Sequence, residues 1–354
     1  MRRLIAAFGL FVAIAPVRAD DTKEYDNRLQ RVTNPKPLLA DFPRYVAPIK
    51  ETERFESAPL VVDDEGEIEL RAWRFSYHAR GIVEVPNTLK GDKTAVIVVH
   101  PWGIDDGQGW VSPEPAGTAF QCTPAKNRLV LKHGGEVIDP LLKRLRSVVK
   151  VVGYSLPGTS DPIREKLYRS TRSQTNAARR EEGQKAIEAK LKGFDYKAEG
   201  LPTTIQVAKT TPTLAYFKEF PGLFAYPNFN PEGYWKLPVP IMSTIKPAID
   251  DIVFYDGDGY EVLRDHLKKQ GVTHVILTGY NTDMCVCSTT AGYKNLQKDF
   301  DVFLVGDATI ATFPGNPDPS IATNAAVSFA SLNLFITQSS WITVRRSDKV
   351  VKDR

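Results

Sequence analysis

From Thr94 onward, short and wholly apolar segments alternate with segments of helical character, and this alternation limits the possible folds more than any other feature of the sequence. A strand that is apolar along its whole length is covered on both faces, which is typical of parallel sheets with helices on either side. The sequence therefore predicts an α/β fold with a doubly wound, mostly parallel sheet. Strands are expected at residues 95–99, 149–153, 252–254, 275–278, 301–305 and 341–344, and helices at 136–148, 260–270, 282–296 and 320–335.

The rest of the chain divides around this core. Residues 20–57 are polar and rich in proline, and residues 58–93 alternate apolar and polar side chains between turn signals, so an arm and a small antiparallel β subdomain are expected over 20–93. Residues 161–240 interrupt the alternation and are interpreted as an insertion over one edge of the sheet or over the site. We expect the α/β core over 94–345 and a C-terminal tail over 346–354.

The N-terminus has the pattern of a secretory signal peptide. Arg2 and Arg3 precede an apolar run over residues 4–14, and Val17-Arg-Ala19 suits signal peptidase. The run is too short to span a membrane, which takes about 20 residues. We therefore expect cleavage after Ala19 and a periplasmic or secreted protein that is not held in the membrane.

Cysteine and charge content narrow the functional classes. The chain has three cysteines, Cys122, Cys285 and Cys287, so at least one lacks an intrachain partner in an oxidising compartment. A free thiol that is retained there is a reason to expect chemistry, although a small buried cysteine is the alternative. The net charge of +4 is modest and unclustered, so no nucleic-acid partner is expected.

Ligands of open α/β sheets lie beyond the carboxyl ends of the strands, which points to three segments. They are residues 100–106, 255–258 and 278–289. In the third segment, Thr282 or Asp283 is expected to cap a helix, and Cys285 falls in its first turn, where free N–H groups and the helix dipole favour a thiolate. Cys287 faces about 200° away at helical spacing and is expected in the core.

This third segment resembles a known family. Thr278-Gly-Tyr-Asn-Thr-Asp-Met-Cys-Val286, followed by Ser288-Thr-Thr-Ala291 and by Val305-Gly-Asp-Ala-Thr309 on the next strand, is similar to the isochorismatase-like cysteine hydrolases, which include nicotinamidases and related amidohydrolases. The first strand with His100 and residues 245–253 resemble further parts of that family. The resemblance covers roughly residues 94–345 without the insertion.

The resemblance implies a Rossmann-like, six-stranded parallel sheet and an Asp, Lys and Cys triad. Cys285 matches the nucleophile, a cis peptide bond is implied between Tyr280 and Asn281, and the amides of Asn281 and Cys285 would form the oxyanion hole. The other two positions differ, because His100 stands where Asp is expected and the Lys position falls near Asp256 or the residue before it. We hypothesise a substituted triad of Cys285, His100 and Asp256, in which imidazole activates the thiol and the carboxylate orients the imidazole.

The expected activity is cleavage of a C–N amide or related bond of a small molecule through a covalent intermediate on Cys285. Substrate contacts are expected from Trp102, Tyr255 and Tyr280. No metal-ligand cluster and no cofactor motif is found, and Asp105 and Asp106 are interpreted as turn residues. A homo-oligomer is implied by the resemblance. Two alternatives are a non-catalytic binding or scaffold protein with a degenerate triad, and a redox-active thiol protein, which the Cys-x-Cys spacing disfavours.

Overall fold

The computed structural model describes residues 22–111, 123–192, 237–312 and 320–345, together with residues 204, 206, 208–210 and 212. The predicted signal peptide, Cys122, the second part of the predicted insertion and the predicted tail lie outside the described residues. The proposed division of the chain into domains therefore stays a prediction. Within the described part, the strands form one twelve-stranded sheet.

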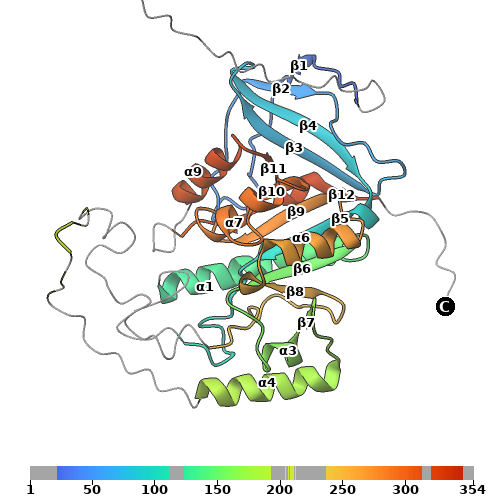
Figure 1. The fold of residues 1–354 in the computed structure, drawn as a ribbon. Helices are drawn as coiled ribbons and strands as arrows, with labels where there is room; N and C mark the ends of the chain where they lie inside the picture. The colour runs from blue at the N-terminus through green and yellow to red at the C-terminus, as the bar shows by residue number, and fades with distance from the viewer. Residues whose placement is uncertain are drawn as a thin grey trace, which may run out of the picture.

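Six strands of this sheet are parallel neighbours and form its centre (Figure 1). The predicted α/β fold class with a mostly parallel sheet is confirmed. A two-residue strand, β7 (Arg169–Ser170), adds to the edge at β8. In spatial order the six strands are β11 (Phe335–Thr337), β10 (Asp301–Ile310), β9 (His274–Tyr280), β5 (Thr94–Val99), β6 (Val151–Leu156) and β8 (Ile252–Tyr255).

The N-terminal strands extend this sheet at its other edge. β3 (Ile68–Ser76) and β4 (Gly81–Leu89) pair antiparallel over nine residues each, and β3 also pairs with β11. The hairpin packs on both faces, because Ile68 and Leu70 belong to one core layer and Trp73 belongs to the other. Residues 59–62, near the start of the predicted β subdomain, form only a bridge at Val62. Two short strands, β2 (Arg54–Ser57) and β1 (Leu29–Arg31), complete the edge.

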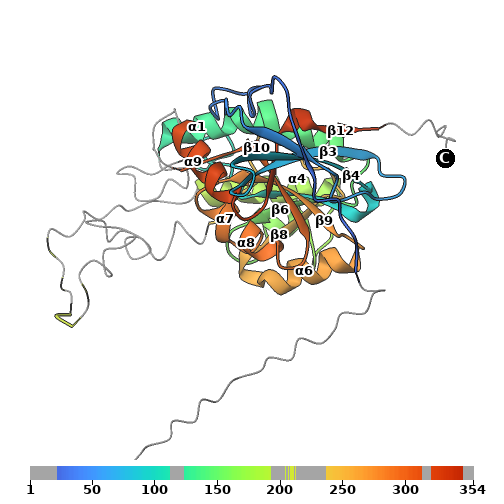
Figure 2. The same cartoon turned by 90° about the horizontal axis from the view of Figure 1, so that it is seen from above.

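Helices cover both faces of the parallel strands (Figure 2). Side chains alternate along a strand, so Val96 and Val98 pack against one layer of helices while Ile97 and Val99 pack against the other. The first layer contains α1 (Pro124–His133), the π-helix η3 (Gly134–Ile138) and α2 (Asp139–Leu145). The second contains α6 (Tyr260–Lys269), α7 (Cys285–Ser288), α8 (Tyr293–Leu296) and α9 (Ser320–Ala330).

The remaining described elements are short or lie at the β7 edge. The helices α3 (Arg164–Leu167) and α4 (Ala177–Lys192) pack together beyond that edge, in the first part of the predicted insertion. Three 3₁₀ turns connect other elements: η2 (Gly91–Lys93), η5 (Asp256–Asp258) and η6 (Ser339–Trp341). Among the described residues, none of the helices combines the length and the apolar character needed to cross a membrane.

Three predicted elements are corrected. The sixth parallel strand is Phe335–Thr337, because α9 ends at Ala330 and the η6 turn sends Ile342–Val344 (β12) antiparallel along β3. The predicted helix over 282–296 is split into α7 and α8, because the backbone is extended at Thr289. The predicted helix at 136–148 begins at Pro124 and runs through a π turn just before Pro140, whose ring nitrogen has no hydrogen to donate.

We expect Gly279→Ala to destabilise the protein by more than about 4 kcal/mol, which is exceptional for one substitution. Gly279 has a φ of +110°, and a Cβ there would lie 2.1 Å from the carbonyl oxygen of Val99 on the neighbouring strand. Gly271→Ala is the matched control, because its φ is +78° but nothing lies within 4 Å. Its expected cost is about 1–2 kcal/mol. Urea unfolding measures both, and equal losses would contradict the close approach.

Candidate active site

The candidate site lies along the carboxyl ends of four neighbouring strands. Cys285 follows β9, His100 follows β5, Ser155 is the penultimate residue of β6, and Asp256 follows β8. These strands stand in the spatial order β9, β5, β6, β8, so residues far apart in sequence meet at one edge. The structure thus brings together the three residues of the hypothesised triad.

His100 and Asp256 form a direct hydrogen bond. The Nε2 atom of His100 lies 2.7 Å from Oδ2 of Asp256, and because a carboxylate only accepts, Nε2 carries the hydrogen. The histidine is 3% exposed. Its backbone has a φ of +45°, and its N–H donates to the carbonyl of Ser155 over 3.0 Å. The imidazole is therefore oriented by its ring bond and by its main chain.

The electrostatic surroundings favour a charged imidazole. Burial lowers the pKa of His100, but the neighbouring sulfur of Cys285 and the carboxylate of Asp256 outweigh burial and raise that pKa to about 9. The Nδ1 atom of His100 is buried and has no hydrogen-bond partner among the described residues. A sulfur beside an imidazolium is the arrangement that favours a thiolate nucleophile.

Cys285 is half-buried at the first position of α7. The predicted side-chain cap is wrong, because Thr282 Oγ1 lies 2.6 Å from Thr309 Oγ1 and Asp283 accepts from the amide of Thr312. α7 has only four residues, so its dipole contributes less than a full helix would.

Cys287 has a different environment. Its sulfur lies 3.4 Å from the hydroxyl of Tyr293, and it packs against the hydrophobic core beneath α7 and α8. Neither Cys285 nor Cys287 is in a disulfide. The two thiols, although two residues apart, therefore face different surroundings.

The backbone around Cys285 is arranged in a way that suits an oxyanion. The peptide bond between Tyr280 and Asn281 is cis, as the resemblance implies. The carbonyl of Asn281 accepts from the amides of Met284 and Val286, over 3.0 and 3.1 Å. Within the described part of the chain, the amide of Cys285 has no acceptor. This N–H is available for a developing negative charge next to the sulfur.

Ser155 and Thr290 also hold Asp256 and were missed by the sequence analysis. Ser155 Oγ donates to Asp256 Oδ1 over 3.1 Å, and Thr290 Oγ1 donates to the Asp256 carbonyl over 3.1 Å. The predicted strand ended at Gly153, two residues before the serine, whereas β6 continues to Leu156. A polar residue near the carboxyl end of a buried strand was the available signal, and the strand boundary concealed it.

The three aromatic residues predicted to bind substrate lie in different places. Trp102 stacks on His100, with ring centroids 4.8 Å apart, and so lies at the site. Tyr255 is buried beneath the guanidinium of Arg164, which lies 4.9 Å from the ring centroid. Tyr280 is fully buried, and its hydroxyl lies 2.7 Å from Nδ1 of His133. The side chains of Tyr255 and Tyr280 therefore pack in the core instead of facing an open site.

The acidic residues after β5 organise turns. Asp105 accepts from the side chain of Asn127 over 2.7 Å, and Asp106 accepts from the amide of Ser243 over 2.8 Å. Among the described residues, no group of three or more His, Cys, Asp or Glu side chains is arranged to hold a metal ion. These carboxylates hold neighbouring loops in place.

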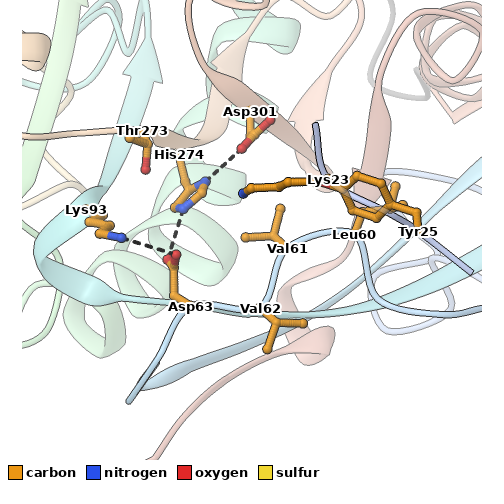
Figure 3. A pocket seen from close by; sticks show the side chains of 10 residues that line it. All are labelled: Lys23, Tyr25, Leu60, Val61, Val62, Asp63, Lys93, Thr273, His274 and Asp301. Carbon is orange, nitrogen blue, oxygen red and sulfur yellow. Dashed lines mark hydrogen bonds and ion pairs between the residues drawn. The ribbon is translucent and has the colours of Figure 1, made fainter. Parts of the chain in front are cut away.

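A cavity of about 480 Å³ lies at the opposite end of the strands from Cys285, where β9 and β10 begin (Figure 3). His274 stands there between two carboxylates, with Nε2 3.0 Å from Asp63 and Nδ1 3.1 Å from Asp301. Because His274 starts the strand whose end leads to Cys285, this cavity is a full strand length from the thiol. It is not the candidate active site.

Comparison with known proteins supports the resemblance that was inferred from the residues around Cys285. Residues 240–330 match the model of the isochorismatase domain. The predicted resemblance to isochorismatase-like proteins is confirmed over this segment. The uncharacterised isochorismatase family protein YrdC of Bacillus subtilis is 31% identical over 91 residues, which are 26% of this chain and 46% of that protein. The chain thus spans about half the length of this curated isochorismatase relative.

Solved structures of isochorismatase-like proteins are similar over a larger part of the chain. A cysteine hydrolase from Pseudomonas syringae pv. phaseolicola 1448A has 16% sequence identity and a TM-score of 0.36, covering 71% of this chain and 91% of its own. A nicotinamidase from Bacillus subtilis has 12% identity and a TM-score of 0.32, covering 70% of this chain and 99% of its own.

We expect Asp256→Asn to lower the pH at which His100 titrates, from about 9 in the unaltered protein, because the carboxylate is one of the two groups that stabilise the imidazolium. NMR titration of labelled histidines measures this midpoint, with His100→Gln to assign the signal. His133 is an internal control, because burial lowers its pKa to about 4 and Asp256 is not among the groups that influence it. A His100 midpoint that stays near 9 in the variant would contradict the assigned role of Asp256.

Proposed function

We propose that this protein is a cysteine hydrolase that cleaves a C–N amide bond of a small molecule through a covalent intermediate on Cys285. The family match suggests a hydrolase of the isochorismatase and nicotinamidase type. The observation that carries the finer proposal is the placement of His100 between the Cys285 sulfur and the Asp256 carboxylate, with the latter bond at 2.7 Å.

In the first half of the proposed reaction, the Cys285 thiolate attacks the carbonyl carbon of the amide. The carbonyl electrons move to oxygen, and the amide of Cys285, with that of Asn281, stabilises this charge. When the carbonyl re-forms, the C–N bond breaks. The imidazolium of His100 gives its Nδ1 proton to the leaving nitrogen, so the amine departs neutral and an acyl-cysteine remains.

In the second half, His100 is a neutral imidazole and acts as the base. It takes a proton from water as the water oxygen attacks the acyl carbon, and the C–S bond then breaks. The thiolate and the imidazolium are restored, and a carboxylic acid leaves. Asp256 keeps the Nε2–H tautomer throughout, so that Nδ1 is the atom that gives and takes the proton.

We expect Cys285→Ala to lower amide hydrolysis at least about 10³-fold, because loss of the nucleophile leaves only binding and the oxyanion site. Ammonia release from a panel of small primary amides measures turnover, and intact-mass spectrometry detects the acyl-cysteine. Cys287→Ala is the matched control and is expected to keep activity, since this sulfur faces Tyr293.

His100→Ala separates the imidazole mechanism from other ways of activating the thiol. Full turnover in His100→Ala together with loss in Cys285→Ala would show that the imidazole is not the base. If wild-type Cys285 also resists a limiting amount of iodoacetamide near neutral pH, the protein is a binder with an inert thiol and the proposed hydrolysis is wrong.

We also propose that the protein is exported, on the basis of the residues that precede Asp20. The basic pair, the short apolar run and the Val17-Arg-Ala19 ending support cleavage by signal peptidase. N-terminal sequencing of protein recovered from the extracytoplasmic fraction is expected to begin at Asp20. Recovery in the cytoplasm with Met1 or Arg2 at the N-terminus would contradict export.

A further inference from the structure

We infer that Ser155 is a positioning residue for the Asp256–His100 pair: its hydroxyl fixes the carboxylate in the one orientation that holds His100 toward Cys285. The inference rests on the proposed function for its catalytic meaning. The positioning itself, in which a serine orients a carboxylate and through it an imidazole, can be measured independently of any hydrolysis.

Ser155 contacts both partners through different groups. Its backbone carbonyl accepts from the N–H of His100 over 3.0 Å, and its hydroxyl donates to Oδ1 of Asp256 over 3.1 Å. The other carboxylate oxygen, Oδ2, accepts from the imidazole over 2.7 Å. Both oxygens of Asp256 are therefore engaged, and the plane of the carboxylate is defined by a hydrogen bond on each side.

The serine is itself immobile. It lies in β6 between β5 and β8, directly opposite Val99 on one side and Phe254 on the other, and it is 0% exposed. A buried hydroxyl without a partner is costly, so this O–H is expected to keep its bond to the carboxylate. A rigid strand thus supplies the donor, whereas the acceptor stands at the start of a short turn.

The backbone of Asp256 is held by other contacts, so its side-chain torsion is set by the hydrogen bonds from Ser155 and His100. Thr290 donates to its carbonyl, and the amide of Gly257 donates to the carbonyl of Gly158 over 2.7 Å. The Asp256 side chain is 23% exposed, so water competes for its oxygens. Without the serine hydroxyl, the carboxylate can rotate toward solvent while its backbone stays in place.

The substitutions that test this inference are Ser155→Ala, which removes only the hydroxyl and keeps the backbone bond to His100, and Ser155→Thr, which keeps a hydroxyl at the position. Ser331→Ala is the matched control, because that serine is also buried and its hydroxyl donates to the backbone carbonyl of Ser328 over 2.6 Å. Circular dichroism and urea unfolding establish that each variant is folded before any other measurement.

Two measurements are made on each full-length variant. One is the NMR titration midpoint of His100. The other is the rate at which iodoacetamide alkylates Cys285 between pH 5 and 9, with Cys285 distinguished from Cys287 by peptide fragmentation.

For Ser155→Ala we expect a lower His100 midpoint and alkylation of Cys285 slowed about tenfold, since one hydrogen bond to a charged group is lost. Ser155→Thr is expected to restore both readouts toward wild type, and Ser331→Ala to leave both unchanged. A loss of stability alone changes neither the His100 midpoint nor the alkylation rate of the folded protein in this way. A serine with a merely structural role would therefore not produce this pattern.

The outcomes separate this inference from the proposed function. If Ser155→Ala leaves the His100 midpoint at its wild-type value, the positioning role is overturned, whatever the reactivity of Cys285. If the midpoint falls in Ser155→Ala but wild-type Cys285 is inert to iodoacetamide, the serine does position the pair and the proposed hydrolase function fails.

Discussion

The candidate site depends on the parallel pairing of β9, β5, β6 and β8. Parallel strands end at the same edge, so each residue that follows a strand meets its counterparts from neighbouring strands. The close approach at this edge is visible where Gly279 faces Val99, with room for no side chain. His100 follows immediately with its φ of +45°, and the carbonyl of Ser155 takes its N–H. The sheet register thereby sets the direction in which the imidazole leaves the strand.

Two buried histidines show that burial alone does not decide protonation. Burial acts on both, yet the pKa of His100 is raised to about 9 and that of His133 is lowered to about 4. The difference lies in their hydrogen-bonding partners: His100 has a carboxylate and a nearby sulfur, whereas His133 has the hydroxyl of Tyr280 and the carbonyl of Asp307. Neutral partners cannot offset the desolvation of a positive charge, whereas the Cys285 sulfur and the Asp256 carboxylate together do so for His100. A charge-bearing site and a neutral structural one thus occur in one fold.

The same contrast holds for the two neighbouring cysteines. Both cysteines pack against the same apolar core, but Cys285 lies beside the imidazole of His100 and Cys287 lies against the hydroxyl of Tyr293. They lie two residues apart on α7, so their side chains point about 200° away from each other. The proposed chemistry therefore belongs to a position in the fold and to its partners, rather than to cysteine as a residue type in this segment.

The sequence by itself determined the features that arise from local patterns. Wholly apolar runs such as residues 95–99 indicate strands covered on both faces, and the segment around Cys285 is distinctive enough to show a resemblance to isochorismatase domains. His100 and Asp256 could be identified as candidate site residues from the sequence because each follows the end of such a run. Only the tertiary structure decided what depends on distant partners: the assignment of Phe335–Thr337 as the last parallel strand, the burial of Tyr255 and Tyr280, and the contact of Ser155 with Asp256. These features follow from pairing register and from packing between distant segments, and Ser155 and Asp256 are 101 residues apart. No local sequence pattern encodes such contacts.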